Sequence, residues 1–149
     1  MSSYIASSHV FLDNPATTID EAFAFLSDKA VELGITDDRA AVLEAFKARE
    51  AMGTTGMSGG FAIPHAKTDA VKHASLVAVK FADHVEWASM DGEPIKAAIA
   101  LFAPASDPTT YLGLLSKVAV LLANEAFRAK VLASEDVVEI ADAIAAGLD

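Results

Sequence analysis

One histidine in this chain follows a run of residues that restricts its backbone. Gly59 and Gly60 lead into the apolar residues 61–63, which stop at Pro64, and His65 comes next. Because proline fixes its own φ angle, this order predicts that the imidazole leaves the end of a short strand in a defined direction. An imidazole can act near neutral pH as a base, a nucleophile or a ligand. His65 is therefore the first candidate for chemistry.

The three other histidines have less defined surroundings. We expect His9 to lie in a loose terminus, and His73 and His84 to lie in solvated loops that flank a strand. No pair of histidines has the close helical spacing of a metal motif, and the chain has no cysteine. We therefore expect no metal site and no cofactor.

A helix end and a polar loop precede the histidine. Arg49 and Glu50 close a predicted helix, and residues 53–60, which are rich in glycine, threonine and serine, lead from it back to His65. Arginine suits bidentate binding of phosphate, while Thr54 and Thr55 offer hydroxyls. Together these residues predict a site for a phosphoryl group, although Arg49 and Glu50 taken alone also fit an ordinary solvated helix end.

Several other kinds of chemistry are not supported by the sequence. It contains neither a G-x-x-x-x-G-K-[ST] loop nor a G-x-G-x-x-G fingerprint, which argues against nucleotide binding. It also lacks the G-x-S-x-G elbow of many serine hydrolases. If a phosphoryl group reaches His65, these absences favour a phosphorylated protein over ATP as the donor.

Length and composition indicate one folded domain that spans residues 1–149. Apolar residues make up 53% of the chain and charged residues 21%, which excludes a disordered protein. A net charge of −10 argues against nucleic acid as a partner. Because we find no cysteine, no signal-peptide pattern and no apolar run of about 18 residues, we expect a cytoplasmic protein that does not insert into a membrane.

The hydrophobic pattern predicts helices at both ends of the chain with strands between them. We expect helices over residues 19–33, 36–50, 109–123 and 124–132, a last helix capped by Ser134, and strands over 61–63, 75–82, 84–89 and 95–103. The cap of the first helix is predicted at Thr18. This order predicts an α/β fold in which helices pack on a central mixed β-sheet.

Three segments in this order carry a family resemblance. Ala48-Arg49-Glu50, then Thr54-Thr55-Gly56, then the segment from Gly59 to His65 resemble the fructose/mannitol-type enzyme IIA domain of the bacterial sugar phosphotransferase system. The similarity covers roughly residues 15–145. It implies a three-layer α/β/α fold, with helices on both sides of the mixed sheet.

The resemblance also implies a mechanism without a cofactor. The family histidine that matches His65 takes a phosphoryl group from the carrier protein HPr on the ring nitrogen remote from the backbone. It then passes the group to a cysteine of enzyme IIB, and sugar never touches the domain. By the same pattern, Arg49 stabilises the phosphoryl charge, Thr54 and Thr55 shape the pocket, and Glu50 and Pro64 support it.

One position departs from the family pattern. Family members commonly have a second histidine where this chain has Tyr111. A tyrosine hydroxyl donates a hydrogen bond but carries no positive charge. Tyr111 either substitutes in part for that histidine or only packs at the start of a helix. Two further hypotheses stay open: a regulatory, nitrogen-type enzyme IIA paralogue whose phosphorylation state controls binding to other proteins, and a structural domain with a decayed site.

Overall fold

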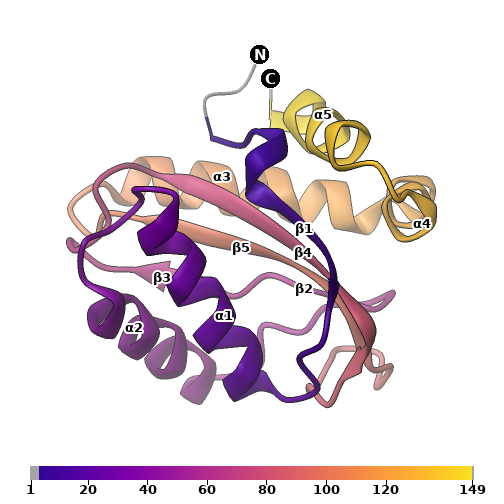
Figure 1. Cartoon of the computed structure of the whole chain (residues 1–149), viewed down its shortest axis with the longest axis horizontal. Coiled ribbons are helices and arrows are strands. Elements are labelled where there is room, and N and C mark those ends of the chain that lie inside the picture. The colour runs from indigo at the N-terminus through magenta and orange to yellow at the C-terminus, as the bar shows by residue number, and fades with distance from the viewer. Residues whose placement is uncertain (1–3, 149) are drawn as a thin grey trace.

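A mixed sheet lies between two layers of helices in the computed structural model, which describes residues 4–148 (Figure 1). The described elements run in the order η1 (Ser7–His9), β1 (Val10–Asn14), α1 (Ile19–Glu32), α2 (Arg39–Ala51), β2 (Phe61–Ala62), β3 (His65–Lys67), β4 (Ser75–Val85), β5 (Ile95–Ala103), α3 (Pro108–Ala123), α4 (Glu125–Ala133) and α5 (Val137–Leu148).

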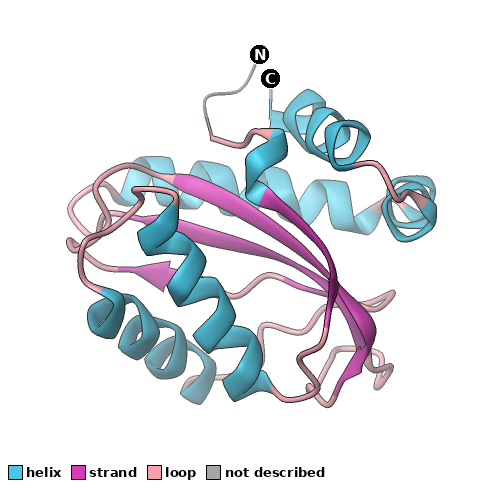
Figure 2. Ribbon diagram, in the orientation of Figure 1, coloured by secondary structure: helices cyan, strands magenta, loops and turns pink. Residues whose placement is uncertain are grey.

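The sheet has the strand order β1-β4-β5-β2, and β3 pairs with β5 on the same side as β2 (Figure 2). Among the strands of residues 4–148, β4 and β5 pair in an antiparallel way and the other strand pairs are parallel. One edge of the sheet is therefore built from two short strands, β2 and β3. That edge carries His65.

Alternating side chains of β4 divide the core into two parts. Val77, Val79 and Phe81 pack with α1 and α2 on one face, as their period-two spacing predicts. Leu76 and Ala78 point the other way and pack under the helices α3 to α5. The α/β class and the three-layer arrangement are thus confirmed.

Side-chain caps set where the helices begin. Thr18 caps α1 as predicted, because its hydroxyl accepts a hydrogen bond from the backbone N–H of Glu21 at 3.2 Å. The predicted start of the second helix at residue 36 is wrong. Thr36 forms a β-bridge with Val71, so the helix begins only after Asp38, whose carboxylate caps it.

The last helix also begins later than predicted. Ser134 does not cap it directly; its hydroxyl instead accepts a hydrogen bond from the backbone N–H of Asp136 at 3.2 Å. The Asp136 carboxylate then accepts from the N–H groups of Val138 and Glu139, which places the start of α5 at Val137.

The predicted loose terminus around His9 is wrong. Residues Val10–Asn14 form the edge strand β1 beside β4, and Nδ1 of His9 hydrogen-bonds to the Leu76 carbonyl at 2.9 Å. So short a segment shows little local pattern, since its stability comes from pairing with a distant strand. The predicted strand over 75–82 continues to Val85 as β4, and half-exposed His84 lies within it rather than in a loop. The separate strand predicted over 84–89 is wrong, because residues 86–89 lie beyond the end of β4 and contribute only isolated bridges.

Within residues 4–148, no helix is both long and apolar enough to cross a membrane.

Candidate functional site

His65 begins a strand, whereas the sequence led us to expect it at the end of one. The sheet edge is interrupted after β2, and His65 opens β3 opposite Leu101 of β5. Pro64 lies in the interruption, where its missing N–H costs no sheet hydrogen bond, while its carbonyl accepts from Leu101 N–H at 2.9 Å. The proline therefore sets the backbone directly before the imidazole.

A cavity of about 330 Å³ opens beside His65 at this edge of the sheet. One face of α2 forms much of its wall, because Ala45, Ala48, Arg49 and Met52 recur at helical spacing. The two alanines leave room for a ligand. His65 and Lys67 from β3 and Tyr111 from α3 complete the described lining.

The imidazole of His65 is only 6% exposed. Burial lowers the pKa of His65 to about 4, and the Arg49 guanidinium adds to the shift, while the backbone of Ile63 and the Glu50 carboxylate oppose it. Nδ1 is buried and no described group satisfies the geometry of a hydrogen bond to it, so the Ile63 contact is a weak one. His65 is consequently a neutral imidazole at pH 7.

Arg49 reaches the cavity from the last turn of α2. Its Nη1 donates a hydrogen bond to the Gly53 carbonyl at 2.8 Å, across the turn that ends the helix. This contact uses one of the five N–H donors of a guanidinium and restricts the side chain. The guanidinium also interacts with the Tyr111 hydroxyl, whose pKa it acts to lower, and its charge and other donors are available to an anion in the cavity that both residues line.

Glu50 turns away from the cavity and holds the loop that follows α2. Its carboxylate accepts hydrogen bonds from the N–H and the hydroxyl of Thr55, at 3.0 and 2.6 Å, and from the indole N–H of Trp87 at 3.1 Å. Thr55 in turn accepts from Ile63 N–H through its carbonyl at 3.0 Å. Glu50 and Thr55 thereby join the end of α2 to the segment that leads to His65.

Thr54 is also occupied within the loop. Its hydroxyl donates to the Ala88 carbonyl and accepts from Gly56 N–H at 3.0 Å. Of the residues proposed from the sequence, Arg49, His65 and Tyr111 therefore line one cavity. Glu50, Thr54, Thr55 and Pro64 lie outside its lining and fix the backbone around it.

The ring of Tyr111 lies near both His65 and Lys67, a residue that was not among the candidates from the sequence. The ring centroids of Tyr111 and His65 are 6.0 Å apart, and Nζ of Lys67 lies 4.9 Å from the tyrosine ring centroid. Burial raises the pKa of the Tyr111 hydroxyl, while Arg49 beside it acts in the opposite direction. The alternation of side chains along a strand could have indicated Lys67 as a site residue, since residues 65 and 67 share a face.

Comparison with known protein families indicates which function a cavity of this kind serves. The model of the phosphoenolpyruvate-dependent sugar phosphotransferase system, EIIA 2, matches residues 3–147. This chain belongs to that family. As an EIIA domain, it is a phosphotransferase component that carries a phosphoryl group on a histidine.

Individual relatives of this EIIA domain come from more than one branch of the family. A fructose-specific EIIA component of Haloferax volcanii is 36% identical over 136 residues, which cover 91% of this chain and 88% of the relative. The crystal structure of the nitrogen regulatory protein IIA-Ntr from Neisseria meningitidis has a TM-score of 0.86 at 26% identity, covering 93% of this chain and 94% of the other. The similar proteins therefore include both a sugar-specific EIIA component and a nitrogen regulatory protein.

A third similar structure is a complex. The Escherichia coli enzyme IIA for mannitol, solved with phosphorylated enzyme IIB, has a TM-score of 0.80 over 95% of this chain and 97% of that one. Its identity of 18% is evidence for the shared fold alone.

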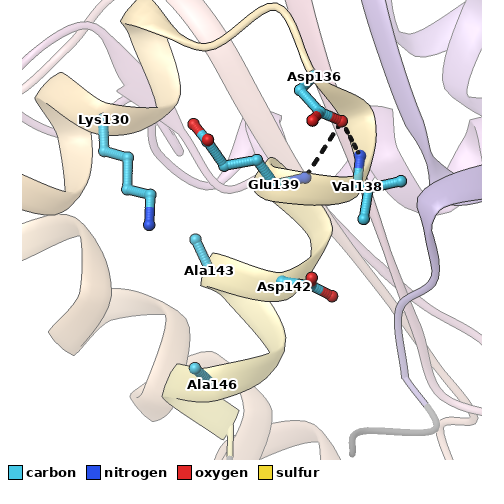
Figure 3. A pocket seen from close by; sticks show the side chains of 7 residues that line it. All are labelled: Lys130, Asp136, Val138, Glu139, Asp142, Ala143 and Ala146. Carbon is cyan, nitrogen blue, oxygen red and sulfur yellow. Dashed lines mark hydrogen bonds between the residues drawn. The ribbon is translucent and has the colours of Figure 1, made fainter.

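A larger hollow of this EIIA domain lies elsewhere. Its volume is about 440 Å³, and its lining includes Lys130 of α4 and the carboxylates of Asp136, Glu139 and Asp142; Figure 3 shows Glu139 extending toward Lys130 and Asp142 pointing away from it. Those carboxylates disfavour a phosphoryl group, whereas the described lining of the His65 cavity contains two cations and no carboxylate. Within residues 4–148, no cluster of three histidines or carboxylates is placed to hold a metal ion.

Proposed function

We propose that His65 accepts a phosphoryl group from phospho-HPr and passes it to an enzyme IIB, in the service of sugar uptake of the fructose/mannitol class. One observation carries the proposal: His65 is a neutral imidazole in a cavity whose described charged residues, Arg49 and Lys67, are both cations. A neutral imidazole is a nucleophile, and cations favour the negative charge of a phosphoryl group.

The proposed transfer uses Nε2 of His65, because Nδ1 is buried against the protein. The Nε2 lone pair attacks phosphorus, and the bond between phosphorus and the donor atom of phospho-HPr breaks, with its electron pair returning to that atom. The proton of the attacking ring stays on Nδ1. Passing the group on reverses these roles, with a nucleophile of the next protein attacking phosphorus and the Nε2–P bond breaking.

Relatives support the choice of partners and sugar class. The Haloferax volcanii relative is described as fructose-specific, and the mannitol IIA of similar fold was solved in a complex with phosphorylated IIB. An EIIA domain with a neutral acceptor histidine fits the same position between HPr and enzyme IIB.

Labelling with phospho-HPr tests the first step. The wild-type chain and the His65→Ala variant are incubated with radiolabelled phospho-HPr, with His73→Ala and His84→Ala as matched controls. We expect both controls to be labelled at the wild-type rate and the His65 variant to stay unlabelled. Label that survives in His65→Ala would refute the assignment of the acceptor.

A regulatory role is the second candidate function. The similarity to IIA-Ntr, at 26% identity and a TM-score of 0.86, favours it. The labelled domain is therefore mixed with enzyme IIB proteins of fructose and mannitol systems. Transfer to one of them supports sugar uptake and names the partner; label retained against every IIB, while His65 still accepts from HPr, supports the regulatory role instead.

A further inference from the structure

Lys67 is a cation without a carboxylate partner at the mouth of the candidate site. It forms no ion pair within the described residues, and the described lining of the His65 cavity contains no carboxylate that could pair with it. Instead its Nζ lies over the ring of Tyr111, 4.9 Å from the centroid. Lys67 therefore places an uncompensated positive charge in the cavity beside His65.

The tyrosine ring restricts where this ammonium can lie. Lysine has four rotatable side-chain bonds, and a cation–π contact favours the rotamers that keep Nζ over the ring face. Since the same ring lies 6.0 Å from the His65 ring, Tyr111 holds Lys67 on the His65 side of the cavity.

A phosphoryl group on His65 would carry more negative charge than one cation neutralises. A phosphoryl group carries roughly −1.5 to −2 charges at neutral pH. Arg49 supplies one positive charge, and Tyr111 supplies none, because a phenol is neutral when it is protonated. The described lining of the cavity holds one further cation, the ammonium of Lys67.

We propose that Lys67, held over the ring of Tyr111, provides the second positive charge for the phosphoryl group on His65. Tyr111 then acts as a positioning residue through its ring, and its hydroxyl is secondary. This inference rests on the proposed function of His65. It explains how a site with tyrosine at position 111 can stabilise a phosphohistidine, since the charge comes from the strand residue that shares a face with the acceptor.

Substitutions at Lys67 and Tyr111 separate the effects of the tyrosine ring, the tyrosine hydroxyl and the lysine charge. Labelling by phospho-HPr is timed for Lys67→Met, Lys67→Arg, Tyr111→Phe, Tyr111→Leu and the double variant Lys67→Met/Tyr111→Leu. Lys72→Met is the matched control, because Lys72 is an exposed lysine paired with Asp37. Each labelled protein is also followed by ³¹P NMR over a pH series, which reports the pKa of the bound phosphoryl group.

Loss of the charge should slow labelling about tenfold in Lys67→Met and raise the pKa of the bound phosphoryl group, whereas Lys67→Arg restores most of the rate. Tyr111→Phe keeps the ring and should be about threefold faster than Tyr111→Leu. The double variant should be no slower than Lys67→Met alone, because the ring acts through the lysine.

Two results would overturn the inference: wild-type rate and phosphoryl pKa in Lys67→Met, or Tyr111→Phe as slow as Tyr111→Leu. Either result, obtained while the wild-type protein is labelled on His65, leaves the proposed function standing. Absence of label from His65 in the wild-type protein contradicts the proposed function itself, and with it this inference.

Discussion

Thr55 gives both of its donors to the Glu50 carboxylate, its backbone N–H at 3.0 Å and its hydroxyl at 2.6 Å. The threonine is 3% exposed and Glu50 is partly buried, so the contact is partly sheltered from water. Because Arg49 is the neighbour of Glu50 and Thr55 bonds to Ile63, this contact sets the position of the arginine relative to His65. Glu50 is therefore a structural support of the site.

Glu50→Gln should destabilise the domain. The amide NH₂ of glutamine cannot accept hydrogen bonds, so at least one donor among Thr55 and Trp87 loses its partner. We expect a loss of about 1–3 kcal/mol in the free energy of unfolding, measured in urea, together with slower labelling by phospho-HPr. Glu44→Gln, on an exposed face of the same helix, is the control and should stay within about 0.5 kcal/mol. Equal stabilities of the two variants would contradict this account.

Arg49→Lys should slow phosphoryl acceptance without unfolding the domain. Lysine keeps the charge but loses the planar fork that contacts Gly53 and leaves further donors for an anion. We expect labelling to slow by roughly 10- to 100-fold, and Arg49→Ala to be slower still. Arg39→Lys serves as the control, since that arginine of α2 pairs with Asp28 away from the cavity. Wild-type kinetics in Arg49→Ala would remove the arginine from the site.

His65 should titrate at unusually low pH. The ring resonances of His65, followed by NMR, are expected to change with a midpoint near pH 4, because burial and Arg49 both lower its pKa. Arg49→Gln removes one of these causes, so the midpoint should move up toward 6.5. A midpoint that is the same in both proteins would show that the arginine does not act on the histidine.

The same pKa gives stability a defined pH dependence. Between pH 6.5 and about 4 the unfolded chain protonates this histidine while the folded protein does not, so acidification favours unfolding. The contribution of His65 to folding is complete above pH 6.5 and falls by roughly 3 kcal/mol toward pH 4. Urea titrations of the wild type and of His65→Gln should therefore differ in slope over this range, the variant being less sensitive to pH.

Local sequence patterns predicted most of the secondary structure, and the strands that they did not predict have a common physical cause. Thr18 caps α1 as its spacing indicates, and the period-two residues of β4 pack on the expected face. Strand β1 and the pairing of β3 were missed because both depend on strands that lie far away in the sequence. A short edge strand carries little signal of its own.

The sequence by itself determined the family, and it singled out His65 and Arg49 as candidate site residues, because these lie in short segments whose order and residue types are recognisable. Tertiary structure alone decided which side chains share the cavity. Tyr111 reaches His65 only because the N-terminal end of α3 meets the sheet edge where β3 pairs with β5. Burial then makes the histidine neutral, and hydrogen bonds to the Ala88 carbonyl and the Glu50 carboxylate occupy the hydroxyls of Thr54 and Thr55 that the sequence suggested for phosphate. Burial and contact depend on residues distant in the chain, which no local pattern contains.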